Sequence, residues 1–276
     1  MILDAFNFRL RIFNLANTKY TMVKKSLQIL NGFAFGATIF INYLSNSGFM
    51  GGKTIGSVSN TIKSLFTPAS YAFSIWGFIY VLLLAFVIYQ SKSLFTTVKD
   101  DSFVEKIGSW FFISCLANSV WVFAWVYEYT GLSCIFIFVL LFSLLKIVLK
   151  LQKEDSPKPY CVLVWLPFAV YSGWVAVASI ANVSSYLVKI NWSGFGLSNE
   201  AWTIIMLIIA TLINLIVLWI KNIKTFVMVG VWALIAIAVA NKGMGNTIEN
   251  ASYLCATILF ANVVFHFFKQ RTIRVD

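Results

Sequence analysis

The stretch FTPASYAFSIWGFIYVLLLAFVIYQ, residues 66–90, runs from a proline-containing turn straight into an apolar segment. Residues 69–90 are enough for a transmembrane helix, because the hydrocarbon core of a bilayer takes roughly 20 apolar residues. Within this segment Phe73, Trp76, Gly77 and Tyr80 are spaced i, i+3, i+4 and i+7, so they share one face of a helix. The stripe indicates helix packing, an interfacial aromatic belt or the wall of a binding site.

The composition places the whole chain in the membrane class. It is 60% hydrophobic and 11% charged, with a mean hydropathy of +0.84, whereas soluble domains contain about 25% charged residues. Eight apolar segments are long enough to span a bilayer: about 26–45, 69–90, 107–127, 131–151, 160–184, 200–220, 224–241 and 249–268. The sequence therefore predicts an all-α integral membrane protein with about eight transmembrane helices.

The distribution of basic residues predicts the orientation. A net charge of +11 on a soluble protein would suggest nucleic acid, but here the cations flank apolar segments and point to topology and anionic lipid. Of the 21 lysines and arginines, only Lys53, Lys63, Lys189 and Lys242 lie in the alternate connections. We expect both termini to be cytoplasmic, in a multi-pass protein of a bacterial-type plasma membrane that binds no nucleic acid.

The ends of the first predicted helix carry further signals. Residues 1–25 form a basic segment that is not a cleavable signal, because Arg9 and Arg11 interrupt its apolar stretch. The segment is either an interfacial amphipathic helix or lies upstream of a start at Met22. The connection 46–68 is long and rich in Gly, Ser and Asn, which is typical of a lid or of a disordered loop.

The chemistry-bearing residues do not favour an enzyme or a metal protein. Cys115, Cys134, Cys161 and Cys255 lie in or beside apolar segments without a CxxC pair, and His266 is the one histidine. No Ser/His/Asp set appears, and we expect no covalent cofactor and no metal. No carboxylate lies in the middle of a segment, which argues against an ion-coupled pump.

Two further segments carry stripes like that of 66–90. Asn118, Trp121 and Trp125 follow one helical face, and Tyr171, Trp174, Ala178 and Asn182 follow another. An asparagine in hydrocarbon needs a hydrogen-bond partner, so both stripes should face the interior. Two hypotheses remain open: helix packing, with the asparagines bonded across interfaces and Gly77 and Ala178 allowing close approach, or a ligand pocket.

These motifs carry a resemblance to a known family. Pro68, Phe73, Ile75-Trp76 and Tyr80, then Asn118-x-x-Trp121, then Tyr171-x-x-Trp174-Val175-x-x-Ala178-x-x-x-Asn182 occur in order. Together they resemble the second-, third- and fifth-helix motifs of the translocator protein and tryptophan-rich sensory protein (TspO/MBR, peripheral benzodiazepine receptor) family. The resemblance covers about 26–190. Residues 191–276 would then be an additional three-helix membrane segment with a basic tail.

The resemblance implies a five-helix bundle with a pocket between its second, third and fifth helices, capped by the first loop. Family members bind porphyrins and other tetrapyrroles, and some bind sterols. The implied ligand-binding residues are Phe73, Trp76, Tyr80, Asn118, Trp121, Tyr171, Trp174 and Ala178, with Pro68, Gly77 and Asn182 as structural support. Leu65-Phe66-Thr67-Pro68 lacks the family's loop tryptophan and second proline, so the resemblance does not extend to the lid contacts.

The sequence thus predicts a membrane receptor, sensor or carrier for a flat apolar ligand. The expected ligand is a non-covalently bound tetrapyrrole, such as a porphyrin or haem, or a sterol-like lipid. The alternative is a multi-pass secondary transporter or a permease subunit, which eight spans and a long external loop allow, although no internal repeat is visible. Gly32, Ala34 and Gly36 would let two copies pack closely, so a homodimer is one expected assembly.

Overall fold

A computed structural model describes residues 2–98, 100–151 and 157–273, with side chains described for 22–98, 100–151 and 157–269. The described residues form helices joined by turns and loops, without a strand. The elements are α1 (Ile2–Asn46), α2 (Ile55–Thr61), η1 (Ser70–Ser74), α3 (Ile75–Phe95), α4 (Phe103–Ile107), α5 (Trp110–Val126), α6 (Thr130–Lys150), α7 (Lys158–Tyr160), η2 (Cys161–Trp165), α8 (Leu166–Lys189), η3 (Gly194–Gly196), α9 (Asn199–Lys221), α10 (Lys224–Ala240) and α11 (Asn246–Ile273).

Among the described residues, six stretches of helix are long and apolar enough to cross a membrane. They are Met22–Asn46, Ser70–Phe95, Thr130–Lys150, Lys158–Lys189, Asn199–Lys221 and Asn246–Lys269. The other two predicted spans correspond to α5 and α10, which are apolar but have 17 residues each. A helix of that length extends about 26 Å, near the lower limit for a ~30 Å hydrocarbon core. The count of eight spans and the location of the termini stay predictions.

The third predicted span is shortened by a break at its start. The sequence pattern begins at residue 107, but Gly108 has φ +56° and separates α4 from α5.

The interfacial hypothesis for residues 1–25 rests largely on side chains outside the described set. The described backbone shows only that α1 is one continuous helix over this region.

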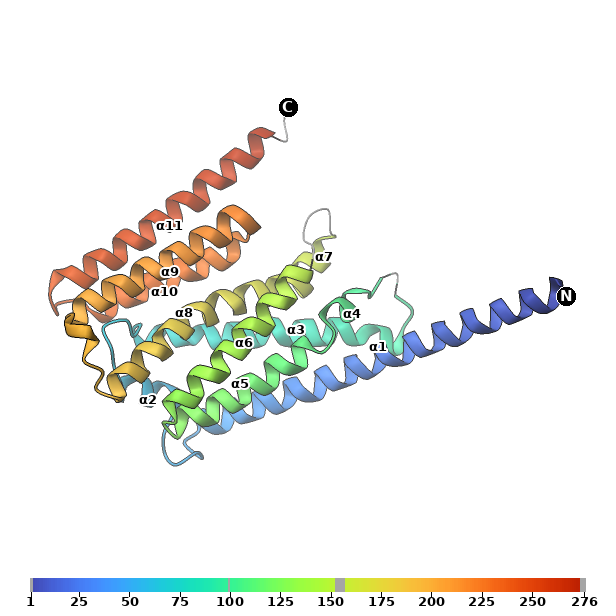
Figure 1. The fold of residues 1–276 in the computed structure, drawn as a ribbon, viewed down its shortest axis with the longest axis horizontal. Helices are drawn as coiled ribbons and strands as arrows, with labels where there is room; N and C mark the ends of the chain where they lie inside the picture. The colour runs from blue at the N-terminus through green and yellow to red at the C-terminus, as the bar shows by residue number, and fades with distance from the viewer. Residues whose placement is uncertain (1, 99, 152–156, 274–276) are drawn as a thin grey trace.

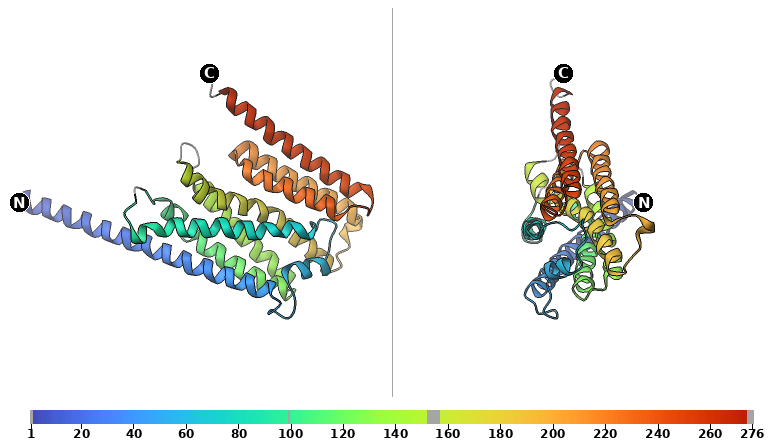
Figure 2. Two further views of the ribbon diagram at one scale, coloured as in Figure 1. Left: turned by 180° about the vertical axis from the view of Figure 1, so that it is seen from behind. Right: turned by 90° about the vertical axis from the view of Figure 1, so that its left-hand side faces the viewer.

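The helices form two groups that meet at α8. Figures 1 and 2 show α1, α3, α5, α6 and α8 running alongside one another, with α9, α10 and α11 on the far side of α8. A Cβ atom added to Gly173 on α8 would lie 2.8 Å from the Phe226 carbonyl oxygen of α10. The glycine therefore lets these two backbones approach closely and joins the two groups.

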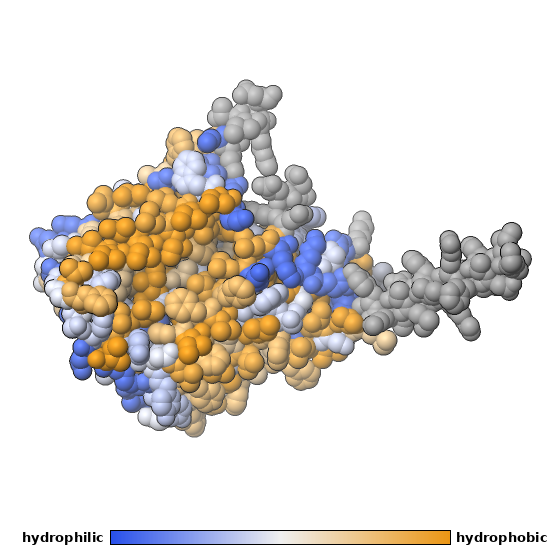
Figure 3. All heavy atoms as spheres, in the orientation of Figure 1, coloured by the Kyte–Doolittle hydropathy of each residue, from blue (hydrophilic) through white to orange (hydrophobic). Residues whose placement is uncertain are grey.

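The outer surface is apolar over most of the length of the helices. In Figure 3 hydrophobic side chains cover the visible sides of the bundle, whereas hydrophilic ones gather towards its ends. Phe33, Phe78, Val81, Ile88 and Ile220 are each more than half exposed. Such a surface would be costly in water over this area, and it indicates that lipid surrounds the bundle.

Candidate ligand site

The aromatic stripes of α3, α5 and α8 converge on Trp76. The Trp76 ring stacks on Tyr80 and Trp121 at centroid distances of 5.8 and 5.7 Å. It meets Tyr171 and Trp174 edge-on at 5.7 and 6.4 Å. Offset stacking and edge-to-face contacts at these separations are the favourable arrangements for aromatic rings. The structure thus brings together the aromatic residues that the sequence proposed for ligand binding.

Asn118 joins three helices beneath this aromatic cluster. Its Nδ2 donates to the Tyr171 hydroxyl at 2.9 Å, and its Oδ1 accepts from Asn42 Nδ2 at 2.8 Å. Asn118 is fully buried, so these bonds offset the cost of removing its amide from water. Asn42, on α1, belongs to the site's support but was not identified from the sequence, because no aromatic stripe accompanies it.

Asn182 performs the same task nearer the lid. Its Oδ1 accepts from Trp121 Nε1 at 2.8 Å, while its Nδ2 donates to Ser133 Oγ at 2.8 Å and Cys134 Sγ at 3.1 Å. Both asparagines are therefore bonded across helix interfaces, as the packing hypothesis predicts. Ser133 and Cys134 lie on α6, so Asn182 connects α5, α6 and α8.

One supporting residue does not act as expected. Gly77 was predicted to share the buried face of Trp76 and to allow close helix packing, but it is exposed, and a Cβ there would meet no atom within 4 Å. The i+4 position falls at the edge of the buried face, because α3 buries a narrow stripe that includes Trp76, Ile79 and Leu83. Close packing is provided instead by Gly173, which lies between Tyr171 and Trp174 in the α8 motif.

A small cavity lies between the aromatic cluster and the first loop. Its volume is about 40 Å³, enough for a water molecule but far below the ~300–1,000 Å³ of typical ligand pockets. The predicted residues that line it are Pro68, Phe73, Trp121, Trp174, Ala178 and Asn182. Trp76, Tyr80, Asn118 and Tyr171 do not line it. The bundle is therefore closed around this position.

Two buried polar groups in the cluster lack a hydrogen-bond partner of normal geometry among the described residues. Among the described residues, no hydrogen-bond acceptor contacts Trp174 Nε1, although Trp174 is only 2% exposed. The Tyr80 hydroxyl is buried near Asn118 but makes no hydrogen bond of normal geometry. Each unsatisfied buried group costs about 1–3 kcal/mol, so the cluster retains hydrogen-bonding capacity that helix packing does not use.

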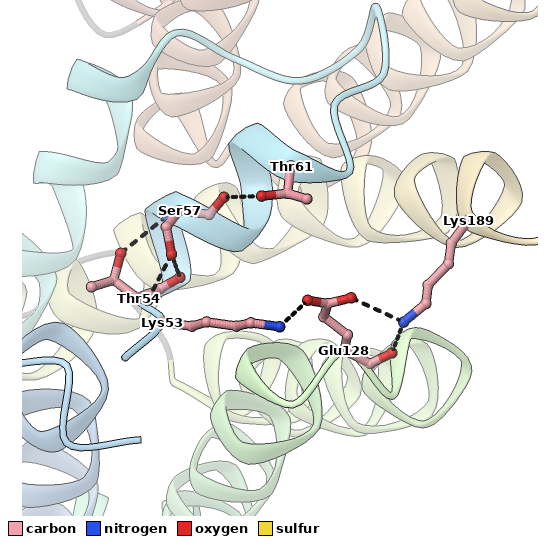
Figure 4. Close-up of polar contacts among 6 residues, drawn as sticks. All are labelled: Lys53, Thr54, Ser57, Thr61, Glu128 and Lys189. Carbon is pink, nitrogen blue, oxygen red and sulfur yellow. Dashed lines mark hydrogen bonds and ion pairs between the residues drawn. The ribbon is translucent and has the colours of Figure 1, made fainter. Parts of the chain in front are cut away.

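The connection between α1 and α3 covers the cavity as a lid, residues 47–69. Its helix α2 begins with reciprocal hydrogen bonds between Thr54 and Ser57 (Figure 4). Trp125 Nε1, on α5, donates to the Ile55 carbonyl at 3.1 Å. Thr67 and Pro68 contribute the lid's inner surface to the cavity. The sequence left open whether this connection is a lid or disordered, and the structure shows an ordered lid.

Charged residues fasten the lid to the bundle. Glu128 accepts from Lys53 of the lid at 2.5 Å and pairs with Lys189 at the end of α8 at 3.4 Å (Figure 4). The hydrogen bond from Lys53 holds the pKa of the Glu128 carboxyl below its ordinary value, with Lys189 acting in the same direction. Because Lys53 is 52% exposed, each pair contributes little stability by itself.

The lid is also attached to α10, which lies outside the predicted five-helix unit. The Ala69 N–H donates to the Ala236 carbonyl at 3.0 Å. Asn241 Nδ2 donates to the Leu65 carbonyl at 2.9 Å. The α10 helix and its C-cap residue Asn241 therefore also hold the lid in place.

The described residues contain no group of His, Cys, Asp or Glu that could hold a metal ion. The arrangement defines a helical membrane protein in which a lid covers a buried aromatic cluster. The family model described as TSPO-like protein matches residues 28–265. The chain belongs to this family. The match includes α9, α10 and most of α11, beyond the region of the motif resemblance. Searches of curated proteins and of solved structures found no match.

Proposed function

We propose that this protein is a membrane receptor or carrier that binds a flat apolar ligand between α3, α5 and α8. The observation that carries the proposal is the buried aromatic cluster around Trp76, in which the Trp174 indole N–H has no partner among the described residues. A flat ligand could stack on these rings and accept the Trp174 hydrogen bond. Family membership supports the same class of function.

A tetrapyrrole or a sterol-like lipid is the proposed ligand class. Porphyrins offer a planar ring for stacking and peripheral acceptors for an indole N–H. The 40 Å³ cavity cannot hold either molecule, so binding requires the lid to move away from Trp121 and Trp174. The lid's exposed ion pair between Lys53 and Glu128 and its few hydrogen bonds to α10 are weak enough to break and re-form.

Binding can be measured by titrating the protein in lipid nanodiscs with protoporphyrin IX or haem while following tryptophan fluorescence. We expect saturable quenching, and roughly tenfold weaker binding for Trp76→Phe combined with Trp174→Phe, because Trp174 lines the cavity and Trp76 packs behind it against Trp121 and Trp174. Trp219→Phe is the matched control, since Trp219 lies on α9 and is 45% exposed. Equal affinities for the double variant and the control would refute this site.

The same preparation separates a receptor from a carrier. A carrier moves the ligand across the membrane of a proteoliposome, whereas a receptor binds it without net flux. The flux measurement is informative only after binding is established, and it should use the double variant as the negative control.

A further inference from the structure

A second cavity, about 530 Å³ in volume, lies where the lid, the end of α8, the 190–198 connection and the start of α9 meet. The turn between α10 and α11 completes it. Its size falls within the range of small-molecule sites. It shares no lining residue with the 40 Å³ cavity, so it is a separate feature of the molecule.

One wall of this outer cavity is aromatic and firmly held. The rings of Trp192 and Trp202 lie 4.8 Å apart, and Trp202 Nε1 donates to the Gly194 carbonyl at 2.7 Å. A Cβ at Gly194 would lie 3.0 Å from that nitrogen, and the residue has φ +67°. The position therefore favours glycine, and the Gly194 carbonyl holds the Trp202 indole against the cavity. Met206 extends the apolar wall along α9.

The cavity also carries positive potential. Lys63 lines the cavity, is exposed, and forms no ion pair with any described residue. Asn199 lies in the first turn of α9, whose N-terminus is capped by the Ser198 hydroxyl at 3.1 Å from the Ala201 N–H. A helix N-terminus favours negative charge. Glu200 follows Asn199 but does not line the cavity, and the described lining contains no carboxylate.

A buried asparagine holds the lid and α10 together beside the cavity. Asn241 lines the cavity and is 2% exposed. Its Nδ2 donates to the carbonyls of Leu65 and Ile237 at 2.9 and 2.8 Å. These two bonds use both amide hydrogens and fix the orientation of the side chain. Its Oδ1 has no partner among the described residues and is itself fully buried, so Asn241 shapes the wall without offering the cavity an acceptor.

We propose that the outer cavity is a second ligand site, for a small amphipathic molecule with an apolar body and one anionic group. The body lies against Trp192, Trp202 and Met206. The carboxylate or phosphate faces Lys63 and the N-terminus of α9. Because it rests on a different cavity, this inference stands whether or not the α3–α5–α8 cluster binds a tetrapyrrole.

The test uses the full chain in zwitterionic nanodiscs and two probes that differ in charge. 4-Iodobenzoate is an anionic heavy-atom quencher, and 4-iodobenzamide is its neutral counterpart. We expect saturable tryptophan quenching that is tighter for the anion. Lys63→Gln should weaken anion binding roughly threefold to fivefold, as expected for a partly solvated charge. Lys242→Gln, at an exposed lysine nearby that does not line the cavity, should leave it unchanged.

Location is read from the fluorescence amplitude. Trp192→Phe with Trp202→Phe should lower the maximal quenching, because the reporters beside the ligand are lost. Equal affinities for Lys63→Gln and Lys242→Gln, or an unchanged amplitude in the double variant, would overturn the proposal. Circular dichroism verifies that each variant folds. If the double variant does not fold, the comparison of Lys63→Gln with Lys242→Gln tests the proposal by itself.

The ligand's anionic group could come from a lipid or from a soluble molecule. Brominated phosphatidylglycerol and brominated phosphatidylcholine distinguish these sources. Stronger quenching of Trp192 and Trp202 by the anionic lipid, with displacement of 4-iodobenzoate, assigns the site to a lipid headgroup. Saturable 4-iodobenzoate binding that phosphatidylglycerol does not displace assigns it to a soluble anion. Absence of saturable quenching by every anionic probe would contradict the inference.

Discussion

Individual polar residues decide how the aromatic cluster is held. Asn182 accepts a hydrogen bond from the Trp121 indole and donates one to Ser133, and both bonds are buried between helices. Asn262 accepts from Trp219 Nε1 at 3.2 Å in a similar pairing, but at an exposed position. The two asparagines therefore accept the same type of hydrogen bond, one buried and one exposed. Comparing their variants shows how much burial adds to the contribution of that bond to stability.

We expect Asn182→Ala to lower the free energy of unfolding by about 1–2 kcal/mol, because Trp121 Nε1 would be buried without a partner. Asn262→Ala should cost less than about 0.5 kcal/mol, since lipid headgroups or water can replace it near the surface. Thermal unfolding in detergent, followed by circular dichroism, compares the two. A smaller effect at Asn182 than at Asn262 would show that the interior bond is not needed.

At the scale of elements, close contacts determine how α8, α9 and α10 assemble. Gly173 permits the approach of α8 to α10, and Gly230 permits that of α10 to α9, where an added Cβ would lie 2.4 Å from Asn214 Oδ1. These contacts involve backbone or buried atoms that cannot move aside cheaply. The C-terminal helices are thus packed onto the bundle, with α10 against α8 and α9 against α10.

Gly173→Ala should destabilise the protein by about 1–3 kcal/mol, because the new methyl group would overlap the Phe226 backbone. Gly77→Ala is the matched control. It should be neutral or stabilising by up to about 1 kcal/mol, since space around Gly77 is open and alanine favours helix. Thermal unfolding measures both variants. Equal melting temperatures would mean that α8 and α10 are not held at this separation.

At the scale of the whole molecule, the connections sort into two ends of the bundle. Lys53 in the first connection and Lys189 at the end of α8 both contact Glu128, which follows α5. At the other end Lys24 pairs with Asp101 at 2.8 Å. These groupings agree with the alternation that the basic residues predict. They place the first, third and fifth connections at one end of the bundle, and the second connection beside the start of the first span.

Accessibility to a membrane-impermeant maleimide tests this topology. In intact cells we expect Lys242→Cys to be labelled and Lys221→Cys to be protected until the membrane is permeabilised, because α10 separates the two positions. The wild-type chain gives the baseline, since its four cysteines lie within or beside apolar helices. Labelling of both variants from the same side would show that α10 does not cross the bilayer.

The sequence by itself determined the membrane class, the approximate positions of the long apolar helices and the inward direction of the two asparagine-bearing stripes. Hydropathy and helical periodicity are local properties, and a residue such as Asn118 or Asn182 can be assigned to the interior from its own chemistry. The motifs also led to the family that the match over residues 28–265 establishes. Periodicity does not reveal which neighbour a residue meets, which is why Gly77 was misplaced and Gly173 and Asn42 were missed.

Only the tertiary structure decided that the lid is ordered and closed, that α10 holds it through Ala236 and Asn241, and that the larger cavity lies at the outer junction. These features depend on contacts between residues far apart in the chain. The volume of a cavity is the space left by side chains from several helices, so no single segment encodes it. The sequence named the residues of the aromatic cluster, and their packing set the space available to a ligand.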